Sequence, residues 1–523
     1  MAITIAKISR EIGLPAILHA PRDLHLIFLT RFLRMLAYGG VALVLALFFA
    51  ALSVPDERIG LFMTLTLLGD VLISLLLTLV ADALGRRRVL LLGCGCMALS
   101  GIVFALASNY WILLVAAIVG VISVSGNEIG PFRAVEESAL AGLVAEDERS
   151  DVFAWYVVVG TLGSAVGLTG CGWLVEACKK IRGWEELDAF RVVFWVYGGI
   201  GLIKAVVTVL LSVKCEVGHD RGKQHAAERA EESERDEFLT PSRSSTDEHD
   251  ANERPLPPTP PRPQPPPKPK MGFTQLSTPT RWMLLKLCLL FAVDSLASGM
   301  VPYSLINFYM DRKFHLPKST LGTIMSVTWL TSSVGNIFAS AIAKRIGLVM
   351  TMAATHLPSA FFLALIPAPS VLWLTVVFLV GRGTLASMDQ APRSAFLSKA
   401  FSPEERTAVM GIVNVVKTLS QSGGPTVTGV LAGKNRFWIS FVVAGAMKAS
   451  YDAGLLTLFL KVDREGRSSG GPPEGAVRLP TRDSQDSFGS LADEFELETD
   501  DEHSSVDGDG KAGKRRDSAA LEA

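Results

Sequence analysis

Long apolar windows constrain this chain more than any other feature. The chain has twelve such stretches, in two groups of six separated by a polar segment. A helix needs ~20 mostly apolar residues to cross about 30 Å of hydrocarbon. The windows lie at about 24–52, 59–81, 89–108, 111–130, 151–173, 191–213, 282–309, 319–342, 348–366, 371–390, 406–431 and 437–460. We therefore expect an all-α membrane protein with twelve transmembrane helices as two six-helix bundles.

The composition supports this expectation. Of 523 residues, 49% are hydrophobic and 19% are charged, and the mean hydropathy is +0.35. These values are too apolar for an ordinary soluble protein of this length. Soluble enzymes, secreted disulfide scaffolds and nucleic-acid-binding proteins are therefore unexpected. Most of the six cysteines fall inside apolar runs, so they are interpreted as core residues, and no metal or cofactor is predicted.

Charge divides the chain into regions. Nearly half of the 101 charged side chains lie in 214–270 or after residue 460. Polar and proline-rich stretches bury too little apolar area to offset their ordering entropy. The predicted regions are a cytoplasmic N-terminus (1–23), a first bundle (24–213), a disordered Pro-rich cytoplasmic linker (214–280), a second bundle (281–461) and a disordered acidic cytoplasmic tail (462–523). An even helix count and the basic N-terminus and linker place both termini in the cytoplasm.

The two groups of helices share residues in the same order. After the fourth window the chain reads NEIGPFRAVEESA and then ERSDV, and after the tenth it reads MDQAPRSAF and then ERTAV. The matched pairs are Glu128 with Asp389, Pro131 with Pro392, and Arg149 with Arg406. Several matches in order predict that one six-helix unit has been duplicated in parallel.

A short motif lies between the second and third windows. Val80 to Leu90 read VADALGRRRVL, which resembles the signature loop of the major facilitator superfamily, usually written GxLaDrxGrkxxl. In that family the loop stabilises the outward-facing state by holding the cytoplasmic side shut. The resemblance implies a gating role for Asp82, Gly85, Arg86 and Arg87. The alternative is a positively charged loop that only ends a helix.

Ionisable side chains inside spanning helices are costly, so they mark a candidate substrate or proton pathway. The candidates are Arg34, Asp70, Glu128, Arg133, Asp294, Arg382, Asp389 and Lys417. The resemblance implies that helices one, four, seven and ten line a central cavity. We expect Asp294 and Arg382 to form the functional pair, because both lie near the middle of their windows. The alternative is a permanent salt bridge between two helices. For Arg34 and Glu128, a structural ion pair competes equally with a substrate role.

Other charged residues are interpreted differently. Lys204 and Lys448 lie in the last helix of each group, and we expect them to be anchors whose amines reach the membrane interface. The isolated histidines His25, His315 and His356 are separated by different predicted helices, and no catalytic or metal-binding spacing appears.

These observations predict a secondary active transporter of a small solute, working by alternating access, with proton coupling favoured. The alternative is a non-transporting membrane receptor or scaffold of the same fold that signals through its linker and tail. We expect a multi-pass membrane protein that is not an enzyme. Its expected partners are the lipid bilayer, the solute and protons. Arg254, Pro257 and Pro260 also fit a weak SH3-binding pattern, for which a stiff spacer is the alternative.

Overall fold

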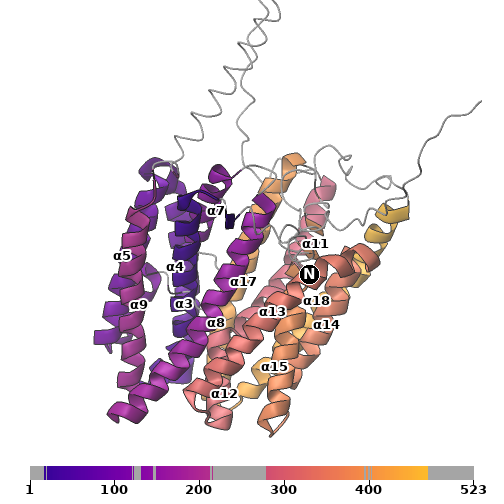
Figure 1. The fold of residues 1–523 in the computed structure, drawn as a ribbon. Helices are drawn as coiled ribbons and strands as arrows, with labels where there is room; N and C mark the ends of the chain where they lie inside the picture. Colours follow the sequence, from indigo (N-terminus) through magenta and orange to yellow (C-terminus); the bar gives the residue numbers. More distant parts are fainter. Residues whose placement is uncertain are drawn as a thin grey trace, which may run out of the picture.

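The computed structural model describes the helical part of the chain. The described residues are 17–18, 20–120, 122, 131–144, 149–212, 215, 278–390, 392–393, 396–397, 401 and 403–468. Their helices stand side by side in one bundle (Figure 1). Most of the predicted linker and tail, including the SH3-type pattern, lies outside these residues.

Seven helices form the first half of the described structure. They are α3 (Arg22–Ala51), α4 (Asp56–Leu84), α5 (Arg86–Leu106), α6 (Tyr110–Val119), α7 (Pro131–Leu143), α8 (Arg149–Arg182) and α9 (Glu186–Val209). Seven more form the second half. They are α11 (Thr278–Met300), α12 (Tyr303–Phe314), α13 (Lys318–Ile346), α14 (Leu348–Leu365), α15 (Leu372–Ser387), α17 (Pro403–Gly433) and α18 (Phe437–Ser468).

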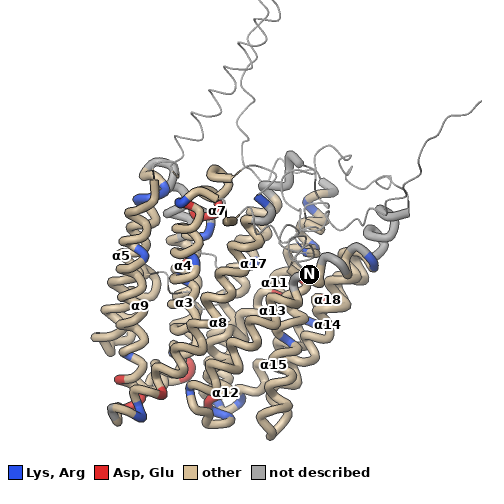
Figure 2. The backbone as a smooth tube through the Cα atoms, in the orientation of Figure 1, with Lys and Arg blue, Asp and Glu red and all other residues tan. Residues whose placement is uncertain are grey.

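All the predicted windows overlap helices, and within the described ranges the chain is helical with no strand, which confirms the all-α class. Among these residues, six helices are long and apolar enough to cross a membrane. They include α3, α5, α9 and α14, together with most of α8 and of α11. Charged residues gather toward the two ends of the bundle (Figure 2). The full count of twelve spans stays a prediction.

Two elements differ from the predicted windows. The seventh window is broken between α11 and α12, because Pro302 lacks the amide hydrogen that would continue the helix. Residues 131–143, expected to be part of a loop, form helix α7, which has Pro131 at its first position. One face of α7, with Phe132, Val135 and Leu140, packs into an apolar cluster with α3 and α8. That amphipathic face explains why the segment is helical.

The turn after the second long helix has the same form in both halves. α4 and α13 are each 29 residues long, and each is followed by a single glycine and another helix. Gly85 has φ +91° and Gly347 has φ +98°, a region that favours glycine. The repeated geometry agrees with the predicted duplication and explains the glycine of the signature-like loop.

The two halves also pack in the same way. In the first half α3 lies on α8 and α5 on α9, and in the second half α11 lies on α17 and α14 on α18. Phe48, Phe104 and Phe194 meet in the first core, with ring centres 4.8–6.1 Å apart. The halves contact each other through α8 on α13 and α4 on α17.

We call the end of the bundle where α9 ends and α11 begins the linker side, and the opposite end, where α3 ends and α4 begins, the far side. Close contacts between the halves occupy the far side, and we call them the seam. Crossings of the seam that are backbone to backbone include Gly60 with Gly429 and Gly322 with Leu168. Such approaches require small residues.

Polar contacts reinforce the seam. Arg312 of α12 forms an ion pair with Asp56 of α4 at 2.6 Å. Lys318 at the start of α13 lies 2.9 Å from Glu186 of α9, and also 2.5 Å from Asp311 of its own half. Three further hydrogen bonds join Thr426 to Thr64, Ser326 to the carbonyl of Ala165 and Asn307 to the carbonyl of Ala42. The far side is therefore closed by both packing and charge.

Gly101→Ala should destabilise the first half. A methyl group at Gly101 of α5 would overlap the backbone of Gly198 in α9, and overpacking of this kind costs about 1–3 kcal/mol. The matched control is Gly199→Ala, where the added methyl meets open space and alanine is the better helix former. Thermal unfolding of the purified variants should show a lower midpoint for Gly101→Ala only. Equal midpoints would contradict the described α5–α9 crossing.

Candidate functional site

A cluster of buried charges lies inside the second half, and Asp294 of α11 is at its centre. Its carboxylate accepts a hydrogen bond from the Lys448 ammonium of α18 at 2.7 Å. The Arg393 guanidinium, which follows α15, lies 3.1 Å from its other oxygen. Asp294 is 4% exposed. A carboxylate so buried is stable as an anion only because two cations face it.

His356 of α14 connects two acids of this cluster. Its Nδ1 lies 3.0 and 3.1 Å from the carboxylate oxygens of Asp452 in α18. Its Nε2 lies 3.6 Å from Asp294. The imidazole is 2% exposed and meets the ring of Tyr451 edge-on. His356 can therefore carry a proton between two acids.

Arg393 extends the cluster to a third acid. It forms an ion pair with Asp389, which is 1% exposed. Its guanidinium also lies over the rings of Phe291 and Tyr451, at 5.3 and 5.4 Å. Planar stacking and bidentate pairing suit arginine better than lysine at this position.

The cluster combines three buried acids with several cations. The acids in ion-pair contact are Asp294, Asp389 and Asp452, and the permanent cations are Lys448 and Arg393. Lys448 and Arg393 contact these acids directly, and the imidazole of His356 lies between two of them. Lys417 of α17 is nearby, 5.9 Å from the Phe291 ring centre, and no described carboxylate lies within ion-pair distance of it. The arrangement places an imidazole, a side chain suited to proton exchange, between two buried acids.

A second buried cluster lies in the first half. Arg34 of α3 donates to Glu136 of α7 at 2.6 Å and to the Tyr156 hydroxyl of α8 at 3.2 Å. That hydroxyl donates to the same carboxylate oxygen at 2.5 Å. Arg31, one turn earlier, lies over the Tyr156 ring at 4.3 Å. Charge therefore joins three helices of the first half, as it does in the second.

The expected pair of Asp294 with Arg382 is wrong. Asp294 pairs with Lys448 and Arg393, and Arg382 of α15 lies instead over the ring of Tyr303, 5.8 Å from its centre. Similar depth in two helices did not place them together, because rotation about each helix axis decides which side chains meet.

The interpretation of Lys204 and Lys448 as interfacial anchors is also wrong. Lys204 is 1% exposed and lies 4.9 Å from the ring centre of Phe132. Lys448 is 5% exposed and donates to Ser298 as well as to Asp294. Both amines are held inside their halves rather than at the membrane surface.

The other predicted site residues have separate positions. Asp70 is buried in α4, and Arg133 pairs with Glu137 on the same helix at 2.6 Å. Glu128 lies outside the described residues, as does the side chain of Asp82. Among the described acids, the ion-pair partner of Arg34 is Glu136.

Arg86 and Arg87 of the signature-like loop contact their own half. Arg86 donates to Ser138 of α7 at 2.6 Å and to the carbonyl of Cys215 at 3.4 Å. Arg87 donates to the carbonyl of Val209 at the end of α9 at 3.1 Å. These bonds hold α5 against α7 and α9 on the linker side, and a gating role stays a prediction.

Sequence reasoning missed several members of both clusters. Arg393, Glu136, Tyr156 and His356 were not selected as site residues. The available signal was spacing: Lys448 and Asp452 are four residues apart and share one face of α18, and Asp389 and Arg393 are also four residues apart. Among the described residues, no group of His, Cys, Asp and Glu could hold a metal ion.

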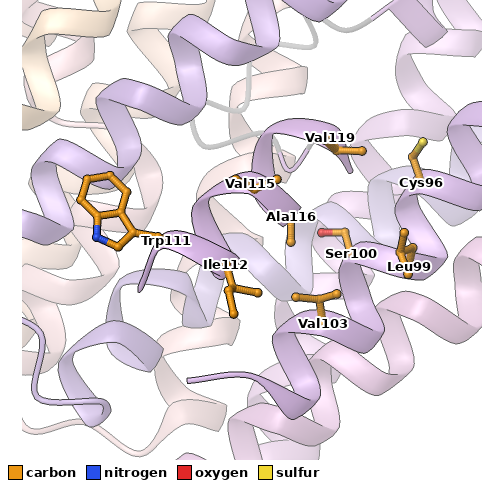
Figure 3. Close-up of a pocket in the computed structure, with 9 residues that line it drawn as sticks. All are labelled: Cys96, Leu99, Ser100, Val103, Trp111, Ile112, Val115, Ala116 and Val119. Atoms are coloured by element: carbon orange, nitrogen blue, oxygen red, sulfur yellow. The ribbon is translucent and has the colours of Figure 1, made fainter. Parts of the chain in front are cut away.

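The structure also has a shallow groove outside the clusters, between α5 and α6 (Figure 3). Leu99 and Val103 form one wall and Ile112 and Val115 the other. Several of these side chains are exposed on the outside of the bundle. Such a surface suits contact with lipid chains, so the groove is not the functional site.

Comparison with known proteins agrees with this architecture. Residues 27–302 and 287–493 match the Major Facilitator Superfamily. The Saccharomyces cerevisiae membrane protein YJR124C is 36% identical over 448 residues, which cover 85% of this chain and 95% of that protein.

Solved structures share the fold at low sequence identity. The nucleoside transporter NupG is 15% identical, with a TM-score of 0.59 over 84% of this chain and 99% of that one. The D-xylose-proton symporter is 12% identical, with a TM-score of 0.60 over 83% and 97%. The chain therefore belongs to the Major Facilitator Superfamily and is a multi-pass membrane transport protein.

Proposed function

We propose that this protein moves a small solute by alternating access and couples the movement to protons through the Asp294 cluster. The observation that carries the proposal is the buried cluster of three acids in which His356 lies between Asp294 and Asp452. A solute whose binding moved α11 or α14 would change the contacts of His356 with these acids, and by linkage a change in those contacts would alter solute binding.

The seam supports the conformational part of the proposal. The halves are joined on the far side by paired small-residue crossings and by ion pairs. With the linker in the cytoplasm, this state is closed to the outside. Transport requires the seam to open while the linker side closes, through rocking of the two six-helix bundles. Asp82, Arg86 and Arg87 would then meet the second half.

The names of the similar solved structures fit this proposal. NupG and the D-xylose-proton symporter are transporters by name, the latter coupled to protons. A non-transporting receptor of the same fold is the competing proposal. Such a receptor needs no exchangeable proton inside the second half, so the first test changes Asp294 in the buried cluster.

Asp294→Asn should uncouple transport from the proton gradient. The amide keeps the shape but removes the charge that faces Lys448, Arg393 and His356, so His356 would lose one of the two acids on either side of it. The solute is first identified by its proton-gradient-driven uptake into proteoliposomes with the wild-type protein. In proteoliposomes with the Asp294→Asn protein, the same solute should no longer accumulate, while its exchange across the membrane continues. The pH inside the vesicles is read with a fluorescent dye.

A structural role for the same pair makes a different prediction. Loss of one partner of a buried ion pair costs about 3–5 kcal/mol, so Asp294→Asn would fail to fold, and Lys448→Gln in the same chain would partly restore folding. Gradient-driven accumulation by a folded Asp294→Asn protein would remove Asp294 from the mechanism. The matched control is Asp188→Asn, an exposed acid at the start of α9.

Lys318→Met should favour opening of the far side. The ammonium pairs with Glu186 of the other half, and a partly exposed pair contributes about 1 kcal/mol. The ratio of open to closed protein should rise about fivefold. The measurement is the labelling rate of a cysteine at Thr64, which bonds Thr426 across the seam, in a background without the six native cysteines.

Lys313→Met is the control for this prediction. Lys313 is likewise a lysine on the far side, but it donates to the carbonyls of Pro367 and Pro369 within its own half. Its loss should leave the labelling rate unchanged. Equal rates in the Lys318 and Lys313 variants would show that the charge pair does not hold the seam.

A further inference from the structure

Aromatic side chains from both halves meet where the seam reaches the middle of the bundle. The ring of Tyr38 in α3 lies 6.3 Å from that of Trp329 in α13, at an interplanar angle of 73°. The Trp329 ring in turn lies 5.2 Å from that of Tyr303 in α12, at 35°. Met35 and Ala42 of α3 belong to the same cluster. Three helices from two halves therefore share one aromatic wall.

This wall retains accessible surface. Tyr38 is buried, but Trp329 and Tyr303 are only half-buried. Trp329 packs against Tyr38 of the other half, so it lies at the boundary between the halves. Exposed Val327 and Leu330 neighbour it in sequence and point in other directions around α13. The wall is thus positioned to contact a solute that enters between the halves.

A cation with no described carboxylate partner lies next to the wall. The Arg382 guanidinium is 5.8 Å from the centre of the Tyr303 ring. Its Nε is buried and has no hydrogen-bond partner among the described residues. By contrast, Arg34 and Arg393 each meet an acid within about hydrogen-bond distance. An arginine inside a membrane protein is costly without a counter-charge, so an anion is the missing partner.

A second unsatisfied group lies against α15, at Gly383. The Ser332 hydroxyl, one turn after Trp329, is buried and has no hydrogen-bond partner in the part of the chain that the structure describes. It lies 3.1 Å from the point where a Cβ would be on Gly383, the residue after Arg382. The absence of that Cβ leaves the hydroxyl room. Both unsatisfied groups therefore lie next to the same helix, α15.

We propose that these side chains form the substrate site and that the substrate is an organic carboxylate with a flat aromatic or unsaturated body. The inference rests on the proposed transport function and adds the substrate class. The residues are Tyr38, Tyr303, Trp329, Ser332 and Arg382. The guanidinium fork matches a carboxylate in a bidentate manner. The aromatic wall takes the flat body by stacking.

The same geometry disfavours other solutes. A cationic solute would face Arg382 without a described acid to offset the repulsion, because the buried acids of α11 and α18 already have partners. A neutral solute would leave the guanidinium uncompensated. The charge of the site therefore selects an anion, and its shape selects a flat one.

The site is connected to the proton cluster through one helix. Ser359 of α14 donates to the backbone carbonyl of Arg382 at 3.0 Å. His356 lies one turn earlier on the same helix. A movement of α15 when an anion binds would therefore be passed to the helix that carries the protonatable imidazole.

The test measures binding rather than transport. Purified full-length protein in nanodiscs is titrated by calorimetry with benzoate, cinnamate and indole-3-acetate, each against its uncharged amide. We expect binding of at least one carboxylate at millimolar or lower concentration and no measurable binding of its amide. Arg382→Gln should weaken carboxylate binding about ten- to hundredfold, as loss of a charge-assisted contact requires. Trp329→Leu should weaken it as well.

Two further variants keep the test decisive. Arg345→Gln removes an exposed arginine at the end of α13 and should leave binding unchanged. Arg382→Lys keeps the charge without the fork and should bind with intermediate affinity, and it replaces Arg382→Gln if that variant does not fold. Binding of no carboxylate, equal binding of an acid and its amide, or full binding by the folded Arg382→Gln protein would each overturn the proposed site.

The outcome separates this inference from the proposed function. If carboxylates bind as expected but no solute drives proton movement in proteoliposomes, the site stands and the transport proposal fails. If a non-anionic solute drives proton movement and no carboxylate binds, transport stands and the site assignment fails.

Discussion

The pairing of buried charge inside the second half is the interaction on which the functional account depends. Asp294 is surrounded by Lys448, Arg393 and His356 from three other segments of the chain. In a low-dielectric interior an unpaired ion would change its protonation state or prevent folding. The same contacts therefore fix the packing of α11, α14 and α18 and create a place where one proton changes the charge balance. Stability and proposed function share one set of residues.

The predicted duplication accounts for a buried charge cluster in each half, and divergence after it accounts for the differences between the clusters. The turns at Gly85 and Gly347 keep the same backbone form, so the helices after them are placed alike. The charges are not alike. In the first helix of each half Arg34 meets an acid, whereas Asp294 meets cations. Among the described residues, only the second half has a histidine between two acids, which is why proton handling is proposed there.

Much of the fold could be predicted from sequence because hydropathy and glycine positions depend on local chemistry. The apolar windows, the all-helical class and the turn at Gly85 required no tertiary information. The partner of Asp294 was not predictable in this way. Depth along α11 and α15 is a matter of counting residues, but whether Arg382 or Arg393 faces Asp294 depends on helix rotation and on the path of the chain after Ser387. Likewise, Lys448 has the sequence context of an anchor, and only packing shows that it is buried.

The central claim is that the closed seam is one of two states exchanged by rocking of the halves. Distances between spin labels test it directly, with one pair on the far side at Arg58 and Lys434 and one on the linker side at Arg88 and Gly411, all exposed positions. The account predicts two populations in each pair, with the far-side distance long when the linker-side distance is short, and a ratio that changes with pH. A single distance in each pair, unchanged by pH, would contradict it.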